Sequence, residues 1–205
     1  MEAYLDNSAT TRVDAQVQEL MKKLMDVDFG NPSSRHQKGV VAEGYIKDAR
    51  QKIAATLKVD PKELIITSGG TESNNMALIG TALAAKRKGN HIITTAVEHP
   101  SVKATASFLE EQGFRITFLS VDSRGQISLE ELKEALTPDT ILVSIMYVNN
   151  EIGTIQPVEE AAKLVHATVP GAVFHVDAIQ AYGKVMIRPK PVSYTHLRAH
   201  ETTLH

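Results

Sequence analysis

The segment VFHVDAIQ carries an acidic side chain, Asp177, to the end of an apolar run and places an amide, Gln180, three residues later. A carboxylate at the end of a strand can pair with a protonated nitrogen of a ligand, and an amide beside it can donate a hydrogen bond. The same carboxylate can equally serve as the N-cap of a following helix. The segment alone leaves both interpretations open.

A glycine-containing segment, SGGTESNN from Ser68 to Asn75, could bind an anion. Free backbone N–H groups at a helix start, the positive end of the helix dipole and the hydroxyl of Thr71 suit a phosphate. The alternative is structural, with Gly69 and Gly70 forming a tight turn and Ser68 or Thr71 capping the helix. The segment matches neither the Walker loop nor the G-x-G-x-x-G loop of dinucleotide-binding folds.

Two further segments supply an imidazole and a pair of amides. His99, in VEHPSV, precedes Pro100, a residue suited to the first position of a helix. Its imidazole could stack on a flat ring or carry protons near neutral pH, although a lone loop His is often a surface or capping group. Asn149 and Asn150, in NNEIGT, could contact a ligand, although paired Asn residues are typical of turns.

An alternation of two periodicities predicts the elements that position these residues. Short apolar runs, typical of strands buried on both faces of a parallel sheet, alternate with amphipathic helical patterns. The predicted strands are LIIT, HIITTA, RITFLSV, TILVSIMYV and AVFHV. The predicted helices are one behind Asp14, one ending near Leu57, one from about Glu72 to Arg87, one from about Ser101 to Gln112, SLEELKEAL and VEEAAKLVHA. We therefore predict an α/β fold, a mostly parallel sheet with helices on both faces.

The candidate residues all follow predicted strands, and ligands bind to parallel sheets where the strands end. An anion site, a flat-ring stacker, amides and a carboxylate together meet the needs of pyridoxal phosphate. Its phosphate needs the anion site, and its pyridine nitrogen needs a carboxylate that keeps it protonated. Its phenolic oxygen needs a hydrogen-bond donor, which Gln180 could supply.

Six segments also occur in the order and spacing of one known family: YLDNSATT, FGNPSSRH, TSGGTESNN, VEHPSV, ILVSIMYVNNEIGTIQP and FHVDAIQAYGK. Over about Ala3 to Arg188 the chain resembles the NifS/IscS-like cysteine desulfurases. These are class V pyridoxal-phosphate enzymes of the aspartate-aminotransferase fold (PLP fold type I). The resemblance implies removal of sulfur from L-cysteine, which gives L-alanine and a persulfide on an enzyme cysteine. It also implies that the sulfur passes to acceptor proteins of iron–sulfur cluster assembly or tRNA thiolation.

The resemblance assigns roles to individual residues. The residues matching Gly70 and Thr71 bind the cofactor phosphate. The residue matching His99 stacks on the ring and shuttles protons, which makes His99 the candidate catalytic residue. The residue matching Asp177 pairs with the ring nitrogen.

Two amides complete the set of cofactor-binding residues that the resemblance implies. The residues matching Asn150 and Gln180 lie near the phenolic oxygen of the ring and near the substrate. They bring the expected set to Gly70, Thr71, His99, Asn150, Asp177 and Gln180.

The resemblance ends after GKVMIRPK. The family continues to a Ser/Thr-x-His-Lys motif, whose Lys forms the Schiff base, and later to a loop with the nucleophilic Cys. This sequence instead reads PVSYTHLRAHETTLH and contains no Cys. We expect residues 191–205 to be non-native, residues 1–13 to belong with the small domain of the family, and residues 14–190 to form a C-terminally incomplete large domain. The chain as written is expected to be inactive and poorly stable, because missing strands would expose backbone edges and apolar faces.

Neither the remaining lysines nor the histidines of the tail suggest a further site. Lys184 and Lys190 do not match the lysine motif of the family. His200 and Glu201 begin like the zincin motif H-E-x-x-H, but the next histidine is His205, which would not share their helical face. We expect no metal site.

Other functions remain as alternatives. A selenocysteine lyase or an aminotransferase would use the same fold and cofactor. A non-catalytic fragment could bind the cofactor or dimerise with a complete subunit. A nucleotide-binding α/β domain is disfavoured by the missing glycine loops.

The amino-acid composition of the chain limits the classes of partner that it could bind. Lys and Arg number 22 against 24 Asp and Glu, so the chain presents no basic field suited to nucleic acid or to anionic membranes. No apolar run is long enough to span a bilayer, and MEAYLDNSATT lacks the features of a signal peptide. We expect a cytoplasmic homodimer that acts on L-cysteine and meets a sulfur-acceptor protein, without nucleic acid or membrane partners.

Overall fold

The computed structural model describes residues 3–189 and 196–198. The chain divides into two compact units, residues 1–65 and 66–205, and each is described by itself. None of the helices in the described ranges has the length and apolar character that crossing a membrane requires.

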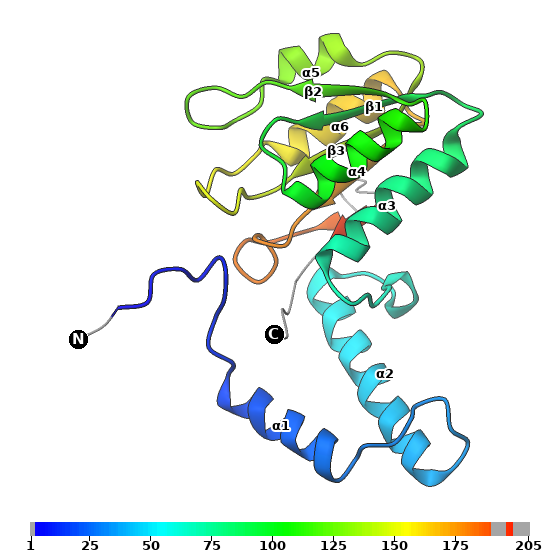
Figure 1. Ribbon diagram of the computed structural model, residues 1–205, viewed down its shortest axis with the longest axis vertical. Helices are drawn as coiled ribbons and strands as arrows, with labels where there is room; N and C mark the ends of the chain where they lie inside the picture. Colours follow the sequence, from blue (N-terminus) through cyan, green and yellow to red (C-terminus); the bar gives the residue numbers. More distant parts are fainter. Residues whose placement is uncertain (1–2, 190–195, 199–205) are drawn as a thin grey trace. The chain divides into compact units, whose positions relative to one another are not determined.

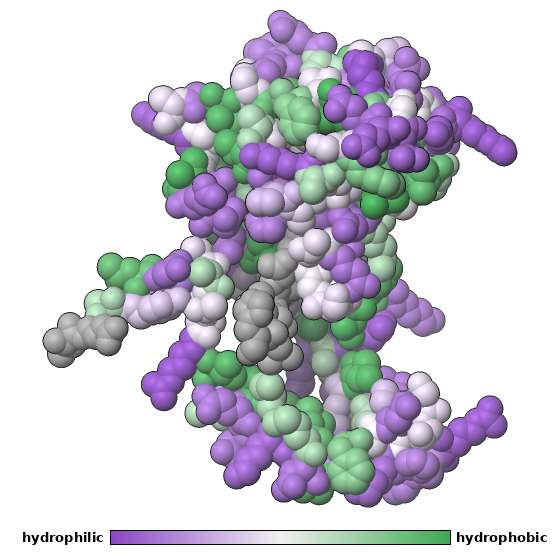
Figure 2. All heavy atoms as spheres, in the orientation of Figure 1, coloured by the Kyte–Doolittle hydropathy of each residue, from purple (hydrophilic) through white to green (hydrophobic). Residues whose placement is uncertain are grey.

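The first unit is helical. The helix predicted behind Asp14 is confirmed as α1 (Ala15–Asp26), and Asp14 is its N-cap, because Asp14 Oδ1 accepts a hydrogen bond from Gln16 N at 2.8 Å. Helix α2 (Gln37–Leu57) follows, and a short 3-10 helix, Pro61–Glu63, comes after it. No residue of α1 is buried, and apolar side chains appear at the surface of this unit in Figure 2.

The segment LIIT was predicted to be a strand, and that prediction is wrong. Residues 64–67 form no strand, and the side chains of Ile65 and Ile66 are 71% and 57% exposed. A strand needs a hydrogen-bonded neighbour, and this segment pairs with none of the strands that the structure describes. Its apolar pattern alone therefore did not determine its structure.

The second unit contains a parallel sheet with the strand order β2-β1-β3-β4-β5. Its strands are β1 (His91–Thr95), β2 (Arg115–Leu119), β3 (Thr140–Met146), β4 (Val173–Asp177) and β5 (His196–Arg198). Every residue of β1 and β3 is buried, which agrees with strands covered on both faces of a parallel sheet. The first four strands match the predicted apolar runs.

Four helices cover the two faces of this sheet, as predicted. They are α3 (Gly70–Ala85), α4 (Pro100–Glu111), α5 (Leu129–Ala135) and α6 (Val158–Thr168). Helix α3 packs against α4, and α5 packs against α6 on the opposite face (Figure 1). The chain leaves β1 for one face and β3 for the other, as right-handed crossovers require. The sheet therefore has a topological switch point between β1 and β3, where ligands of open α/β sheets bind.

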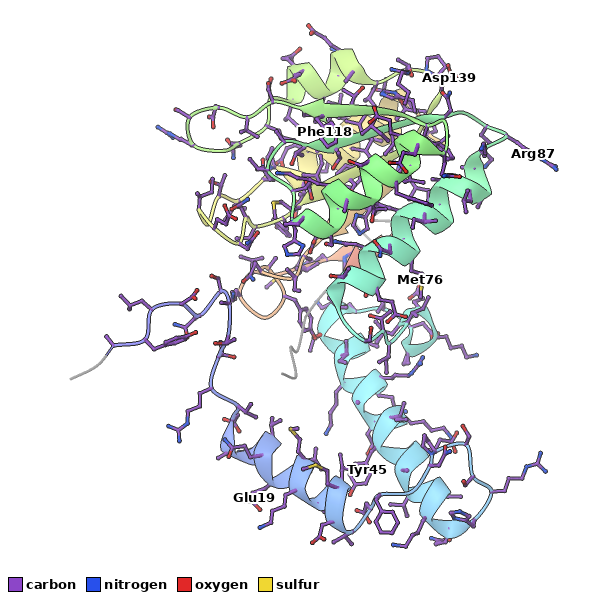
Figure 3. The ribbon with its side chains drawn as sticks, viewed as in Figure 1. Glu19, Tyr45, Met76, Arg87, Phe118 and Asp139 are labelled. Carbon is purple, nitrogen blue, oxygen red and sulfur yellow. The ribbon has the colours of Figure 1, made fainter. Side chains whose placement is uncertain are left out.

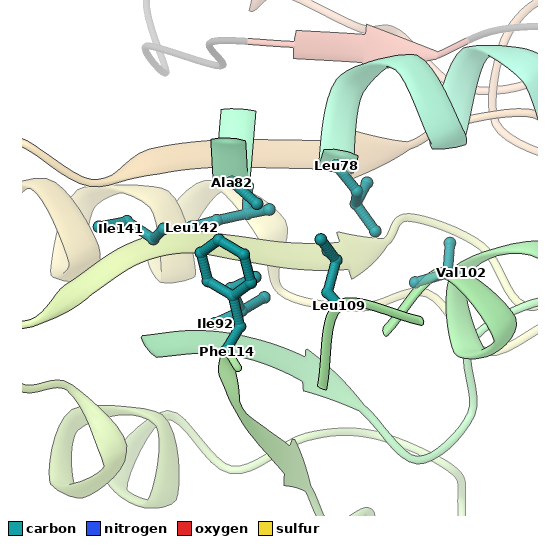
Figure 4. Close-up of a cluster of buried hydrophobic side chains, with 8 residues drawn as sticks. All are labelled: Leu78, Ala82, Ile92, Val102, Leu109, Phe114, Ile141 and Leu142. Carbon is teal, nitrogen blue, oxygen red and sulfur yellow. The ribbon is translucent and has the colours of Figure 1, made fainter. Parts of the chain in front are cut away.

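The core between the sheet and helices α3 and α4 holds the carboxyl edge in place. Leu78 and Ala82 of α3 pack with Ile92 of β1, Leu109 of α4 and Leu142 of β3 (Figure 4). Each of the larger side chains is fully buried, and such burial stabilises a fold by roughly 1.5–3 kcal/mol per side chain. The strand ends that carry the candidate residues are thus anchored on a well-packed scaffold.

Strand β5 differs from the sequence prediction, which found no strand pattern in the tail. Three residues, His196–Arg198, pair in parallel with β4 and extend the sheet by one short strand. Lys190, His200, Glu201 and His205 lie outside the described residues. The expected boundaries at residues 13 and 190 stay predictions.

Candidate active site

Asp177 is the last residue of β4 and lies at the carboxyl edge of the sheet. Its side chain is buried, and its main chain is fixed by a 2.8 Å hydrogen bond from Tyr147 N to Asp177 O. Asp177 Oδ1 accepts a hydrogen bond from Ile179 N at 3.2 Å. This hydrogen bond is the kind that a capping carboxylate makes. The segment that follows, residues 179–184, forms turns, so Asp177 does not cap an α-helix. The second carboxylate oxygen, Oδ2, makes a contact that the sequence did not predict.

That contact comes from Asn74, on the second turn of α3. Asn74 Nδ2 donates to Asp177 Oδ2 at 3.0 Å and to Ser101 Oγ at 3.0 Å. Asn74 is fully buried, and its Oδ1 has no hydrogen-bond partner among the described residues. The sequence signal was weak, because Asn74 lies in a run of polar residues between Ser73 and Asn75 and no local pattern marks it for burial.

His99 is the N-cap residue of α4, next to the end of β1. Its Nδ1 accepts a hydrogen bond from Ser101 N at 3.2 Å and lies 2.8 Å from Ser101 Oγ. The imidazole is half-buried, so one side of it can still meet a ligand. The predicted capping role is confirmed, and the bonds at Nδ1 leave the far edge of the ring for other contacts.

The expected phosphate site lies at the start of α3. Gly70 is buried in the first turn, and the N-cap residue is Gly69, which makes no side-chain cap. Capping of this helix by Ser68 or Thr71 is therefore wrong. Glu72 Oε2 instead accepts hydrogen bonds of 2.6 Å from both Ser68 Oγ and Ser68 N, which lowers the pKa of the Glu72 carboxyl.

A shallow hollow of about 680 Å³ runs along the outer side of this helix. Its lining residues form two adjacent rows spaced four residues apart, Thr71, Asn75 and Ile79 in one and Glu72 and Met76 in the other, so the hollow follows one face of α3. Met76 marks that outer face in Figure 3. The hollow reaches the phosphate site through Thr71, but most of it lies away from Asp177 and His99.

The two asparagines after β3 have different environments. Asn149 Oδ1 accepts from Glu151 N at 2.8 Å and from Ile152 N at 2.9 Å, so Asn149 builds the predicted turn. Its Nδ2 donates to Val97 O at 3.0 Å and ties the loop after β3 to the loop after β1. The side chain of Asn150 is half-buried and makes no hydrogen bond to the residues that the structure describes.

Gln180 follows Asp177 in the turn after β4. It is half-buried, and its Oε1 accepts a hydrogen bond from Lys184 Nζ at 2.9 Å. This bond uses the amide oxygen, so the amide nitrogen is the group that could donate to a ligand. The expected role of Gln180 as a donor to the ligand stays a prediction.

Glu98 is a second buried acid that the sequence did not point out. Its Oε1 accepts from Thr95 Oγ1 at 2.8 Å and from Met146 N at 2.9 Å, which joins the ends of β1 and β3. Its Oε2 is buried without a hydrogen-bond partner among the described residues. Burial, with a smaller contribution from the charge of Asp177, raises the pKa of Glu98 to about 8. Glu98 is therefore mainly neutral at pH 7.

The carboxyl edge thus brings together the residues that a phosphorylated pyridine ring requires. A helix N-terminus without a side-chain cap, a half-buried imidazole and a buried carboxylate come from α3, α4 and β4 of one compact unit. At the same edge, Asn74 Oδ1 and Glu98 Oε2 are buried and have no hydrogen-bond partner among the described residues. The chemistry of these residues fits a phosphorylated pyridine cofactor.

Residues 3–193 match the family model described as aminotransferase class-V. Since this match spans most of the sequence, the chain belongs to the class V aminotransferase family, and its fold is the PLP type I fold.

Comparison with individual relatives shows which members of this family the chain is similar to. The chain is 48% identical over 187 residues to a putative cysteine desulfurase IscS of Bacillus subtilis, covering 91% of this chain and 49% of the relative. It is 48% identical over 186 residues to a cysteine desulfurase IscS of Dictyoglomus turgidum, covering 91% and 47%. The chain spans about half the length of the curated relatives that it matches.

Solved structures agree with the sequence comparison. A NifS-like protein superposes with a TM-score of 0.91 at 42% identity, covering 95% of this chain and 53% of that protein. A structure of SspA in complex with cysteine superposes with a TM-score of 0.90 at 38% identity, covering 96% and 56%. The chain therefore resembles the NifS/IscS-like cysteine desulfurases, as the sequence motifs predicted.

Proposed function

We propose that this chain supplies the cofactor-binding half of a pyridoxal-phosphate-dependent cysteine desulfurase. The observation that carries the proposal is the buried Asp177 carboxylate at the end of β4, held by Asn74 and set beside the switch point of the sheet. Asn74 and the backbone of Ile179 donate hydrogen bonds to this carboxylate, and a protonated ring nitrogen would add the positive charge that favours a buried carboxylate. The similarity to proteins named cysteine desulfurases supports L-cysteine as the substrate.

Bound pyridoxal phosphate supplies a ring that withdraws electrons from the carbon atoms of an attached amino acid. Asp177 would hold the ring nitrogen in its protonated form through charge-assisted hydrogen bonding. The N–H groups at the start of α3, at Gly70 and Thr71, together with the Thr71 hydroxyl, would bind the phosphate. Because all three residues sit on elements of one packed unit, the ring and its phosphate would be fixed at both ends.

The other expected residues would act on the open face and edge of the ring. His99 would stack on the ring and exclude water from its face. Gln180 Nε2 would donate to the phenolic oxygen, and Asn150, which makes no hydrogen bond to the described residues, would be free to bind the same oxygen or the substrate. These roles follow the resemblance residue by residue, and the half-buried positions of all three side chains support them.

The experiment that tests this proposal joins residues 1–188 to the remaining half of the B. subtilis relative. With pyridoxal phosphate and L-cysteine, this chimera is expected to release alanine, while the 205-residue chain as written is expected to release none. Selenide from selenocysteine, or a keto acid in place of alanine, would favour the alternative activities. Absence of alanine from a folded chimera that binds the cofactor would contradict the proposal.

We further propose that the complete enzyme forms a dimer with a second copy of the chain and passes sulfur to an acceptor protein. We propose that it does so in the cytoplasm. The apolar residues on the exposed surface of α1, among them Val17, Leu20 and Met25, are consistent with an interface. Light scattering of the chimera would test dimer formation.

A further inference from the structure

A chain of hydrogen bonds connects the two residues that would hold the cofactor ring. It runs from Asp177 Oδ2 to Asn74 Nδ2, from Asn74 Nδ2 to Ser101 Oγ, and from Ser101 Oγ to His99 Nδ1, with distances of 3.0, 3.0 and 2.8 Å. Asp177, Asn74 and Ser101 are buried. Ser101 has no role in the function proposed above, and Asn74 enters it only through its hydrogen bond to Asp177.

The directions of these bonds follow from the donor inventory. An amide nitrogen has two hydrogens and no acceptor site, so Asn74 Nδ2 donates to both oxygens. Ser101 Oγ therefore accepts from Asn74 and retains its own hydrogen for His99 Nδ1. The opposite orientation of the amide would set Asn74 Oδ1 against the Asp177 carboxylate, oxygen against oxygen, and is disfavoured.

A backbone bond fixes the tautomer of His99. Ser101 N–H can only donate, and it points at His99 Nδ1 at 3.2 Å. Nδ1 must therefore be the unprotonated nitrogen, which accepts from both the N–H and the hydroxyl of Ser101. The proton of the neutral imidazole consequently resides on Nε2.

We propose that Asn74 is a positioning residue that orients Asp177 directly and His99 through Ser101, so that His99 presents Nε2–H as a hydrogen-bond donor toward the ligand. One buried amide thereby holds the acceptor at the ring nitrogen and, through the Ser101 hydroxyl, supports the His99 tautomer that the Ser101 N–H fixes. In this tautomer Nε2 donates and does not accept, so an anionic group, such as a carboxylate or thiolate of the substrate, is the partner it suits. This inference rests on the proposed function for the identity of the ligand, and on the hydrogen bonds alone for the tautomer.

The test uses the full 205-residue chain with 15N-labelled histidine, and His99→Gln identifies the His99 signals. At alkaline pH, NMR is expected to show a protonated Nε2 and an unprotonated Nδ1 for His99. A protonated Nδ1, or a mixture of tautomers, would overturn the inference. This readout requires no cofactor.

A second readout uses pyridoxamine 5′-phosphate, which binds without a lysine, in NMR titrations. Asn74→Ala and the isosteric Asn74→Asp are both expected to weaken binding on the order of tenfold, because each removes a hydrogen bond to a charged group. The matched control is Asn75→Ala on the same helix, which loses a hydrogen bond from Thr105 but touches neither Asp177 nor Ser101 and should bind as the wild type does.

The binding results distinguish a failure of the positioning role of Asn74 from a failure of the proposed cofactor-binding function. Equal binding by Asn74→Asp, Asn75→Ala and the wild type would overturn the positioning role, since the aspartate preserves packing, removes the amide donor and sets a second carboxyl group against Asp177. No binding by the wild type would instead count against the proposed function. The tautomer measured on the same sample would then still decide the inference about His99.

Discussion

The substitution Glu98→Gln should make the stability of the chain much less dependent on pH. The carboxyl of Glu98 has its pKa raised from 4.5 to about 8 in the folded protein, mainly by burial. Between these two values the folded state retains a proton that the unfolded state has released, so the free energy of unfolding falls as pH rises. Below about pH 4.5 both states are protonated, and the penalty is absent.

The size of the effect follows from the same pKa values. Each pH unit in that window lowers the free energy of unfolding by about 1.4 kcal/mol, which amounts to about 3 kcal/mol between pH 5 and pH 7.5. Glutamine cannot ionise, and its Oε1 can still accept from Thr95 and Met146 N. Glu98→Gln is therefore expected to be more stable than the wild type at pH 7.5, with a smaller difference at pH 5.

Urea unfolding followed by far-ultraviolet circular dichroism at several pH values between 5 and 8 measures this difference. The control is Glu72→Gln, at an exposed carboxyl whose pKa is lowered, which should not reproduce the trend. Parallel stability curves for the wild type and Glu98→Gln across this range would refute the reasoning.

Three further predictions concern the scaffold of the site. Burial lowers the pKa of His91 to about 4, so stability should fall as pH drops from about 6.5 toward 4, and the difference in urea midpoint between the wild type and His91→Gln should shrink or reverse in that range. Asn149→Ala removes three hydrogen bonds from the loop after β3 and should cost about 2 kcal/mol in urea unfolding, whereas Asn150→Ala should stay within about 0.5 kcal/mol. Gly125→Ala should cost about 1 kcal/mol in urea unfolding because its φ is +77°, and the exposed end of Ile152 can move away from the new Cβ; Gly113→Ala, with φ +89° and open space, should cost a similar amount.

The parts of the fold that depend on local signals could be predicted from the sequence. The buried strands β1 and β3 are short runs rich in apolar and β-branched residues, and Asp14 and Pro100 mark the starts of α1 and α4. The segment LIIT has the same apolar character but lacks a paired neighbour. Strand formation depends on such a partner, and periodicity cannot supply that information.

The site could be predicted only to the extent that its residues follow strands. Asp177, His99 and Asn150 were found because parallel strands end at one edge. Asn74 was missed because its partner Asp177 lies 103 residues away, and no local pattern records that contact. Glu98 was missed because a charged residue in a loop beside His99 is expected to be exposed. In the structure the loop after β1 buries its carboxyl, which accepts a hydrogen bond from Met146 N at the end of β3.

The protonation of the ring nitrogen tests the central claim most directly. The measurement is the 15N chemical shift of ring-labelled pyridoxal phosphate bound to the chimera of residues 1–188 with the second half of the B. subtilis relative. A protonated nitrogen is expected with Asp177, and an unprotonated nitrogen with Asp177→Asn. An unprotonated nitrogen with Asp177, or the same signal in both proteins, would contradict the assignment of this carboxylate as the partner of the cofactor.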